Sequence, residues 1–256
     1  MTSYKGSIKL ITGGENSSEY FYPVTLAKSV FFSDGTSLEN KSFSSGGSRL
    51  AGKKLYIIGD SITARNAYQQ TLISEFGLAS YNNGLSGNGI PIGGNGMAKK
   101  FAGGAMMDTK CDICMMLLGT NDSHYAVTKG NDGTYNYLNL GTEDDEPSLY
   151  QTSFWAGVKY MLEKMINNFK GKPILVVAPP QRTDSVIDSD GVHANVYLGE
   201  RVDILEKACR KYSVAFLDLY HNHTSQIILG DGVHPSTDGG MVEMGKIIGN
   251  KLSTLV

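Results

Sequence analysis

Apolar and polar residues change their spacing after residue 52, where short, mostly unalternated apolar runs begin to alternate with helical stripes. The unalternated runs predict strands that are covered on both faces, at residues 54–58, 79–82, 113–118, 174–178 and 214–217. Apolar residues at helical spacing predict helices over 150–169, 198–209 and 241–255. This alternation predicts an α/β domain in which helices cover both faces of a parallel sheet.

Residues 1–48 follow a different pattern. They hold short β-like pieces among Gly, Ser and Asn, and Ser44-Ser45-Gly46-Gly47-Ser48 is typical of a flexible linker. We therefore expect a small β-rich segment over 1–48 and one main domain over 49–256. The segment is too short to bury a core of its own, so we expect it to serve attachment or oligomerisation.

Composition excludes several classes of protein. The net charge of the 256 residues is −2 and the basic residues are scattered, so neither a nucleic-acid stripe nor a polybasic membrane patch is predicted. No apolar run approaches the roughly 20 residues of a membrane span. The first residues lack the layout of a secretory signal, so we expect synthesis in the cytoplasm and leave the final location open.

The cysteines and one histidine pair could suggest metal or redox chemistry. Cys111 and Cys114 form a C-x-x-C spacing, but they lie on an apolar run where residues three apart face opposite sides of a strand. We interpret them as buried free thiols. His221 and His223 are expected to be solvated, because a His-x-His pair without an obvious acidic partner is weak evidence for metal.

Polar motifs follow two of the predicted strands and precede the last helix. Gly59-Asp60-Ser61 follows the first strand, Gly119-Thr120-Asn121-Asp122 ends the third, and Asp231-Gly232-Val233-His234-Pro235 precedes the helix. Ligands of parallel α/β sheets bind at the carboxyl ends of the strands. We therefore expect the side chains of these motifs to meet at that edge.

Together the motifs supply the parts of a serine hydrolase. Ser61 is the candidate nucleophile, although alone it would be interpreted as a helix N-cap. Asp231 can orient His234 from the same short loop, which leaves the other ring nitrogen for Ser61. The Asn121 amide, the Ser61 N–H and the N–H of a glycine in the 82–89 loop, whose glycines could also be mere loop glycines, are candidate oxyanion donors. Asparagine at a strand end is usually a turn former, so this role rests on its position opposite Ser61.

A second copy of the Asp-Gly-Val-His tetrapeptide occupies residues 190–193, after the fourth strand. Alanine rather than proline follows it, so we prefer His234 as the base. His193, His124 and Asp60 remain candidates for contact with the substrate.

The combined motifs resemble the GDSL/SGNH hydrolase family, whose four marker residues are Ser, Gly, Asn and His. They match Ser61, Gly87, Asn121 and His234, and Asp231 matches the triad acid. The resemblance covers residues 52–256. It implies a three-layer, flavodoxin-like α/β/α fold with a five-stranded parallel sheet, and ester hydrolysis by a Ser-His-Asp triad without metal or organic cofactor.

Substrates in that family range from acetylated sugars to lipids, thioesters and arylesters. We expect a serine esterase that acts on O-acetyl or other short acyl esters of carbohydrate. A lipid or thioester acylhydrolase is the related alternative. A further alternative is a non-catalytic phage structural or glycan-binding protein on the same scaffold, since fold does not fix function. Residues 17–42 look similar to short N-terminal segments of phage tail and prophage structural proteins. This resemblance implies that the N-terminal segment joins a tail assembly, where the enzyme trims acyl groups from cell-surface glycans.

Residues 123–149 depart from the family pattern as a long polar segment directly after Asn121. Segments of this length are usually functional or disordered. It could be a lid or a sugar-contacting wall in which Tyr125, Tyr135 and Tyr137 stack on sugar rings. A solvated insertion is an equally good interpretation.

Overall fold

A five-stranded parallel sheet forms the centre of the domain, as the sequence predicts. The computed structural model describes residues 48–91, 96–123, 126–129, 135–137, 140–185 and 194–256. The sheet has the order β2-β1-β3-β6-β7 and consists of β1 (Lys54–Gly59), β2 (Ala79–Gly84), β3 (Ile113–Leu117), β6 (Ile174–Ala178) and β7 (Ala215–Asp218). Each predicted strand agrees with the observed one to within two residues at either end.

The order of the strands creates a switch point beside β1. The chain adds β2 on one side of β1 and then returns to add β3 on the other side. Crevices that bind ligands in open α/β sheets lie at the carboxyl ends of strands that flank such a point. The loops after β1 and β3, which carry Ser61 and Asn121, therefore leave neighbouring strands at the same edge.

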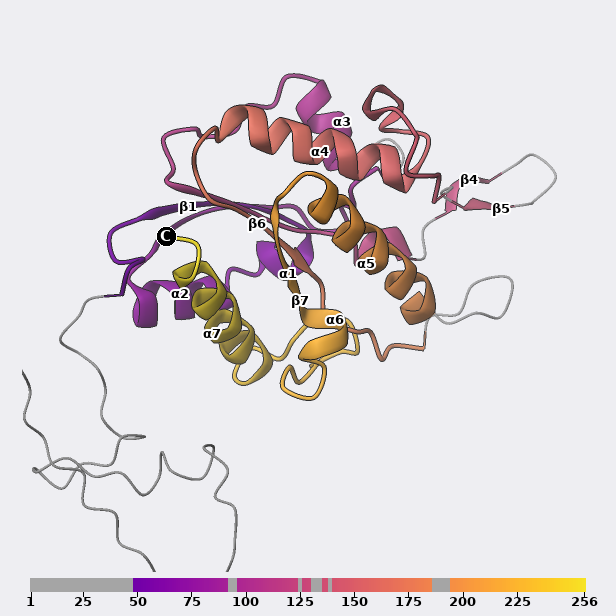
Figure 1. Ribbon diagram of the computed structural model, residues 1–256. Helices are drawn as coiled ribbons and strands as arrows, with labels where there is room; N and C mark the ends of the chain where they lie inside the picture. Colours follow the sequence, from indigo (N-terminus) through magenta and orange to yellow (C-terminus); the bar gives the residue numbers. More distant parts are fainter. Residues whose placement is uncertain (1–47, 92–95, 124–125, 130–134, 138–139, 186–193) are drawn as a thin grey trace, which may run out of the picture. The chain divides into compact units, whose positions relative to one another are not determined.

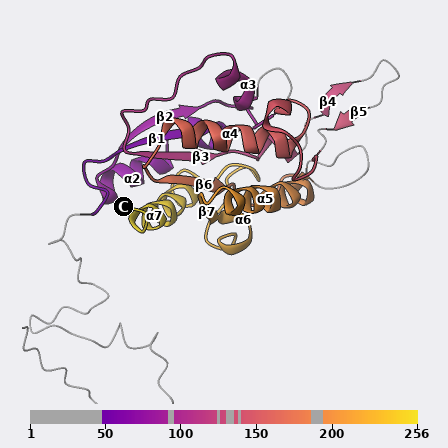
Figure 2. The same cartoon turned by 45° about the horizontal axis from the view of Figure 1, so that its top comes forward.

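Helices cover both faces of the sheet (Figures 1 and 2). On one face lie α3, α4 and α5, and on the other lie α2 and α7, which gives the expected three-layer α/β/α arrangement. The helices are α1 (Ser61–Ala64), α2 (Tyr68–Phe76), α3 (Met97–Ala102), α4 (Phe154–Asn168), α5 (Ala194–Lys211), α6 (Leu219–Asn222) and α7 (Gly240–Ser253).

Alternate residues of the central strands enter two separate apolar cores. In β1, Leu55 and Ile57 pack in the core on the α2 and α7 side, whereas Tyr56 and Ile58 pack in the core under α3, α4 and α5. All four side chains are buried. A strand enclosed on both faces needs apolar residues at every position, which explains the unalternated runs in the sequence.

The cysteines are structural in this arrangement. Cys111, Cys114 and Cys209 are free thiols, and all three are buried in the core under α3, α4 and α5. The interpretation of the C-x-x-C spacing as buried free cysteines is therefore confirmed. The expectation that Cys111 and Cys114 face opposite sides of a strand is wrong, because Cys111 precedes β3 and both side chains pack in the same core.

Two strands that the sequence did not predict lie in the segment after β3. Strands β4 (Ala126–Lys129) and β5 (Tyr135–Tyr137) form an antiparallel pair that is separate from the five-stranded sheet. Tyr135 and Tyr137 belong to β5, while Tyr125 lies outside the described residues. Whether this segment contacts substrate stays a prediction.

Helix α4 begins at Phe154 rather than at residue 150 as predicted. A short 3-10 helix, Pro147–Leu149, comes first, and Ser153 then caps α4 by accepting a hydrogen bond from the Ala156 N–H at 3.1 Å. The cap supplies one acceptor for the unpaired N–H groups of the first turn.

Residues 48–256 form one compact unit. The N-terminal segment proposed over 1–48 lies outside the described residues except for Ser48, so its role in attachment stays a prediction. Within the described part of the chain, no helix has the length and apolar character needed to cross a membrane.

Candidate active site

Ser61 is the first residue of α1, directly beyond the carboxyl end of β1. Asp60 caps this short helix, with its Oδ1 accepting the Ile62 N–H at 2.9 Å. Glycine is required where α1 rests on the sheet: a Cβ at Gly59 would lie 2.0 Å from Thr63 Oγ1, and one at Gly84 would lie 2.3 Å from the Ala64 nitrogen. The two glycines thus allow the turn that brings Ser61 to the edge.

A chain of hydrogen bonds connects Ser61 to His234 and Asp231. The Ser61 Oγ lies 2.7 Å from His234 Nε2, and His234 Nδ1 lies 2.8 Å from Asp231 Oδ2. The other carboxylate oxygen of Asp231 accepts the backbone N–H groups of Val233 at 3.0 Å and His234 at 2.7 Å. An acid that holds one ring nitrogen leaves the other nitrogen to accept a proton from the serine.

The carboxylate of Asp231 is ionised in this setting. Burial raises its pKa, but the backbone N–H groups of His234 and Val233 and the imidazole of His234 outweigh burial and hold the pKa well below its usual range. Hydrogen bonds to a charged carboxylate favour the charged form. Asp231 therefore presents a negative charge to the imidazole throughout the neutral pH range.

Asn121 and Gly87 lie on two separate segments, which are joined by a hydrogen bond from the side-chain amide of Asn121. Asn121 follows β3, is 8% exposed and donates from Nδ2 to the carbonyl oxygen of Asn88 at 2.9 Å. Gly87, which directly precedes Asn88 in the chain, has a φ of +74° and is exposed. The carboxylate of Asp122 fixes the same loop by accepting the Ile90 N–H at 3.1 and 2.9 Å. The amide nitrogen of Asn121 carries two N–H donors, and its hydrogen bond to the Asn88 carbonyl oxygen uses one of them.

Asp60 does not reach the surface, contrary to the expectation of contact with substrate. Its side chain is fully buried and serves as the cap of α1. Burial raises the pKa of Asp60 to about 7, against hydrogen bonds from Ile62 and Thr120 that lower it. Burial likewise raises the pKa of Asp122 to about 7, and the nearby Arg201 offsets part of this effect.

The raised pKa of Asp60 predicts a loss of stability as pH increases. Between its ordinary pKa of 3.8 and the folded value of about 7, the unfolded chain has released a proton that the folded chain keeps, so unfolding becomes easier. At about 1.4 kcal/mol per pKa unit, the loss reaches up to about 4 kcal/mol above neutrality. We expect Asp60→Asn, which keeps an acceptor for the cap, to raise the free energy of unfolding in urea at about pH 8 and to change it little near pH 4.

Asp108→Asn is the matched control, since Asp108 accepts the Lys110 N–H at 3.0 Å in an exposed turn. Asp108→Asn measures how the same change from carboxylate to amide alters the free energy of unfolding at the surface. An Asp60→Asn gain of equal size at both pH values would show that ionisation of Asp60 is not the cause.

The other predicted histidines fall into two groups. His124 and His193 lie outside the described residues, as does the whole of the 190–193 tetrapeptide. His221 is exposed as expected, but it does have an acidic partner, because its Nδ1 lies 2.8 Å from Asp218 Oδ2. Asp218 and His221 repeat the Asp-x-x-His geometry of the site. A serine hydroxyl against the second ring nitrogen distinguishes His234.

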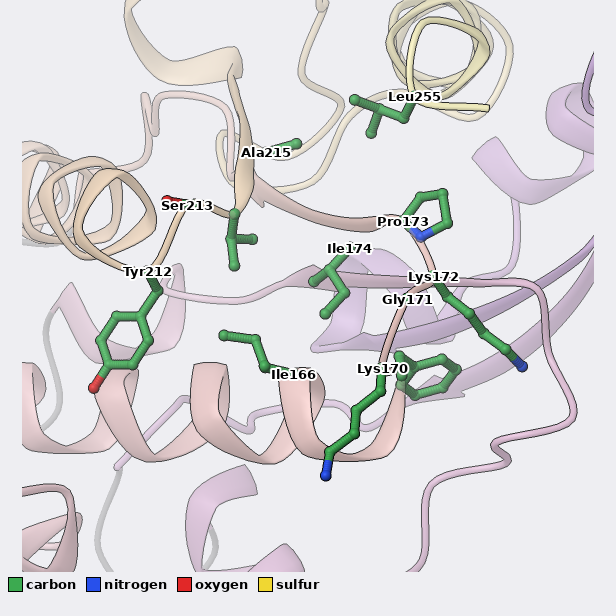
Figure 3. A pocket seen from close by; sticks show the side chains of 12 residues that line it. Ile166, Lys170, Gly171, Lys172, Pro173, Ile174, Tyr212, Ser213, Ala215 and Leu255 are labelled. Atoms are coloured by element: carbon green, nitrogen blue, oxygen red, sulfur yellow. The ribbon is translucent and has the colours of Figure 1, made fainter.

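A hollow of about 490 Å³ lies away from Ser61, at the amino ends of β6 and β7 (Figure 3). The ends of α4 and α5 and the residues that follow them form its walls, including Ile166, Ile174 and Tyr212. Catalytic residues of α/β sheets gather at the carboxyl edge, so this hollow is not part of the candidate site.

The chain belongs to the GDSL-like lipase/acylhydrolase family, whose family model matches residues 57–240. A search among curated proteins found no match.

Several solved structures share the fold. A lipase/acylhydrolase from Enterococcus faecalis is 19% identical with a TM-score of 0.52, and the match covers 79% of this chain and 96% of that one. An acetyl-xylooligosaccharide esterase from Geobacillus is 16% identical with a TM-score of 0.54, covering 79% and 94%. A carbohydrate acetylesterase from Sinorhizobium meliloti is 16% identical with a TM-score of 0.53, covering 80% and 100%.

Sequence reasoning missed one residue of the site. Arg65, one helical turn beyond Ser61, places its Nη2 3.2 Å from Asp231 Oδ2. The spacing of four residues from Ser61 was the available signal, because residues four apart lie on one face of a helix. Its partner is 166 residues away in the chain, so the contact itself could not be predicted.

Proposed function

We propose that the protein is a serine esterase that removes O-acetyl or other short acyl groups, with carbohydrate esters as the natural substrates. The observation that carries the proposal is the hydrogen-bonded chain from Ser61 Oγ through His234 to Asp231 at the carboxyl edge of the sheet. Membership of an acylhydrolase family supports ester hydrolysis.

In the acylation step, Ser61 Oγ attacks the ester carbonyl carbon and passes its proton to His234 Nε2. The carbonyl electron pair moves to oxygen, and the carboxylate of Asp231 stabilises the imidazolium that forms. When the tetrahedral intermediate collapses, the leaving alcohol takes the proton from Nε2 and the acyl group stays on Ser61.

The negative oxygen of the intermediate needs donors that are already in place. We assign this role to the N–H groups of Ser61 and Gly87 and to the Asn121 amide. Two contacts support the assignment: the bond from Asn121 to the Asn88 carbonyl and the bond from the Ile90 N–H to Asp122. They hold the Gly87 loop against the end of β3 before substrate arrives.

In the deacylation step, a water molecule gives a proton to His234 Nε2 and attacks the acyl carbon. Collapse of the second intermediate releases the carboxylic acid and returns the proton to Ser61 Oγ. The same imidazole thus serves as base and then acid in each half of the cycle.

The preference for short acyl groups on sugars is supported by two of the structures that share the fold, which are named as an acetyl-xylooligosaccharide esterase and a carbohydrate acetylesterase. The family description covers lipases as well, so a lipid or thioester acylhydrolase is the competing function.

A series of p-nitrophenyl esters from acetate to long acyl chains tests the proposal, together with acetate release from acetylated xylo-oligosaccharides. We expect kcat/KM to be highest for acetate and to fall with chain length, and the sugar substrate to release acetate. A maximum at long chains would indicate a lipid acylhydrolase. No turnover of any ester would indicate a non-catalytic binding or structural protein.

A further inference from the structure

The guanidinium of Arg65 and the carboxylate of Asp231 form an ion pair beside His234. Nη2 of Arg65 lies 3.2 Å from Asp231 Oδ2, the same oxygen that lies 2.8 Å from His234 Nδ1. Both partners face water, with 41% of the Arg65 side chain and 49% of the Asp231 side chain exposed.

The exposed carboxylate of Asp231 needs contacts that hold its side chain in one conformation, and the ion pair with Arg65 is one of them. A carboxylate that orients an imidazole has to keep one rotamer, and water competes for the oxygens of an exposed carboxylate. Oδ1 of Asp231 is held by the backbone N–H groups of Val233 and His234. Oδ2 is shared by His234 and Arg65. These donors account for about four acceptor sites, which is the capacity of a carboxylate.

Arg65 itself is placed by its neighbours on α1. Its backbone N–H donates to the Ser61 carbonyl oxygen at 3.1 Å, so it lies one turn beyond the serine. Asn82 of β2 donates to the Thr63 carbonyl oxygen at 2.8 Å and to Asn66 Oδ1 at 3.3 Å. Asn66, with a φ of +54°, ends the helix directly after Arg65. The base of the Arg65 side chain is therefore fixed relative to Ser61.

We propose that Arg65 is a positioning residue that holds Asp231 Oδ2 against His234 and so keeps the imidazole aligned with Ser61. This inference rests on the proposed esterase function. An exposed ion pair contributes little to folding stability, so its main effect falls on catalysis. Small misplacements of a reacting group can cost as much as about 100-fold in rate, and we expect about a 10-fold loss because the other three bonds to Asp231 remain.

The test compares Arg65→Gln and Arg65→Lys with wild type, using p-nitrophenyl acetate. This substrate carries no anionic acyl or sugar group for the guanidinium to bind. We expect Arg65→Gln to lower kcat about 10-fold with KM changed less than about twofold, which marks an interaction that acts in the transition state. Arg65→Lys keeps the charge but loses the planar fork, and we expect it to recover part of the loss.

Salt supplies an independent measurement on the unmutated protein. Screening of an exposed pair becomes strong at about 1 M ionic strength, where the Debye length is about 3 Å. We expect kcat of the wild type to fall with added NaCl and kcat of Arg65→Gln to respond less. If Arg65→Gln folds poorly, the kcat of Arg65→Lys takes its place, because this variant keeps the charge and loses only the planar fork; a kcat equal to that of wild type would then overturn the role of the guanidinium.

Arg210→Gln is the matched control, since Arg210 is an exposed arginine that pairs with Glu206 at 2.9 Å in the last turn of α5. We expect it to match wild type in kcat, KM and salt response. A kcat of Arg65→Gln within about twofold of wild type, or a rise in KM alone, would overturn the positioning role. Failure of the esterase proposal would look different, because the wild type would then hydrolyse no ester, or Ser61→Ala would hydrolyse esters as fast as the wild type.

Discussion

Replacing Ser61 by alanine is expected to lower kcat for p-nitrophenyl acetate by about 10⁴- to 10⁶-fold while leaving the fold intact. The hydroxyl lies 2.7 Å from His234 Nε2 and is only partly buried, so its loss leaves no large cavity. The residual rate would come from the oxyanion donors and from substrate binding. The measurement is steady-state hydrolysis, with far-UV circular dichroism and a thermal melt to check folding.

Ser74→Ala is the control for this substitution, because Ser74 is an exposed serine on α2 whose hydroxyl donates to the Thr71 carbonyl oxygen. We expect it to hydrolyse esters like the wild type. A fluorophosphonate, which loses fluoride as its phosphorus bonds to the serine oxygen, should add the mass of its phosphonyl group to wild type and to Ser74→Ala but not to Ser61→Ala. Turnover of Ser61→Ala at the wild-type rate would remove Ser61 as the nucleophile.

Removal of the Asn121 amide is expected to lower kcat by about 10²- to 10³-fold and to change KM little. An oxyanion donor acts on charge that develops only in the transition state. Asn121 is buried, and one N–H of its amide donates to the Asn88 carbonyl oxygen. Asn121→Ala removes this hydrogen bond and therefore also loosens the Gly87 loop. Steady-state kinetics and a urea titration separate the two effects.

Asn168→Ala provides a control at the end of α4, where the Asn168 amide donates to the Lys164 carbonyl oxygen at 2.8 Å. It reports the cost of losing an amide that bonds only to backbone. If Asn121→Ala lost stability to a similar degree and kept its kcat, Asn121 would be a turn former and another donor would have to be found.

The sequence predicted the fold best where consecutive residues of a strand are all buried. Strands β1 and β3 are enclosed by helices on both faces, so each appears as an unbroken apolar run that ends at a polar motif. Helix α1 has four residues, too few for a periodic pattern, and it depends on contacts from Asn82 and from Gln69 to the Thr63 carbonyl oxygen. Gln69 and Asn82 lie six and 19 residues beyond Thr63 in the chain, and neither spacing belongs to a periodic pattern that predicts a helix.

The candidate site shows the same limit at the level of single residues. Ser61 and His234 could be selected because each lies in a motif with a chemical purpose. The Asp218 and His221 pair has the same spacing as Asp231 and His234 and a similar hydrogen-bonded geometry. What distinguishes His234 is the hydroxyl of Ser61, 2.7 Å from its Nε2, and the fold brings this neighbour from 173 residues away in the chain.

The buried thiols allow the opening of one helical layer to be followed without any added label. Cys111, Cys114 and Cys209 share the core under α3, α4 and α5, and burial raises the pKa of each thiol, that of Cys209 to about 12. The thiolate is the nucleophile that attacks an alkylating reagent, so modification has to wait until helices separate from the sheet. The time course of alkylation in native buffer therefore measures the frequency of that opening, and its dependence on an ester analogue would reveal whether an occupied site holds the layer closed.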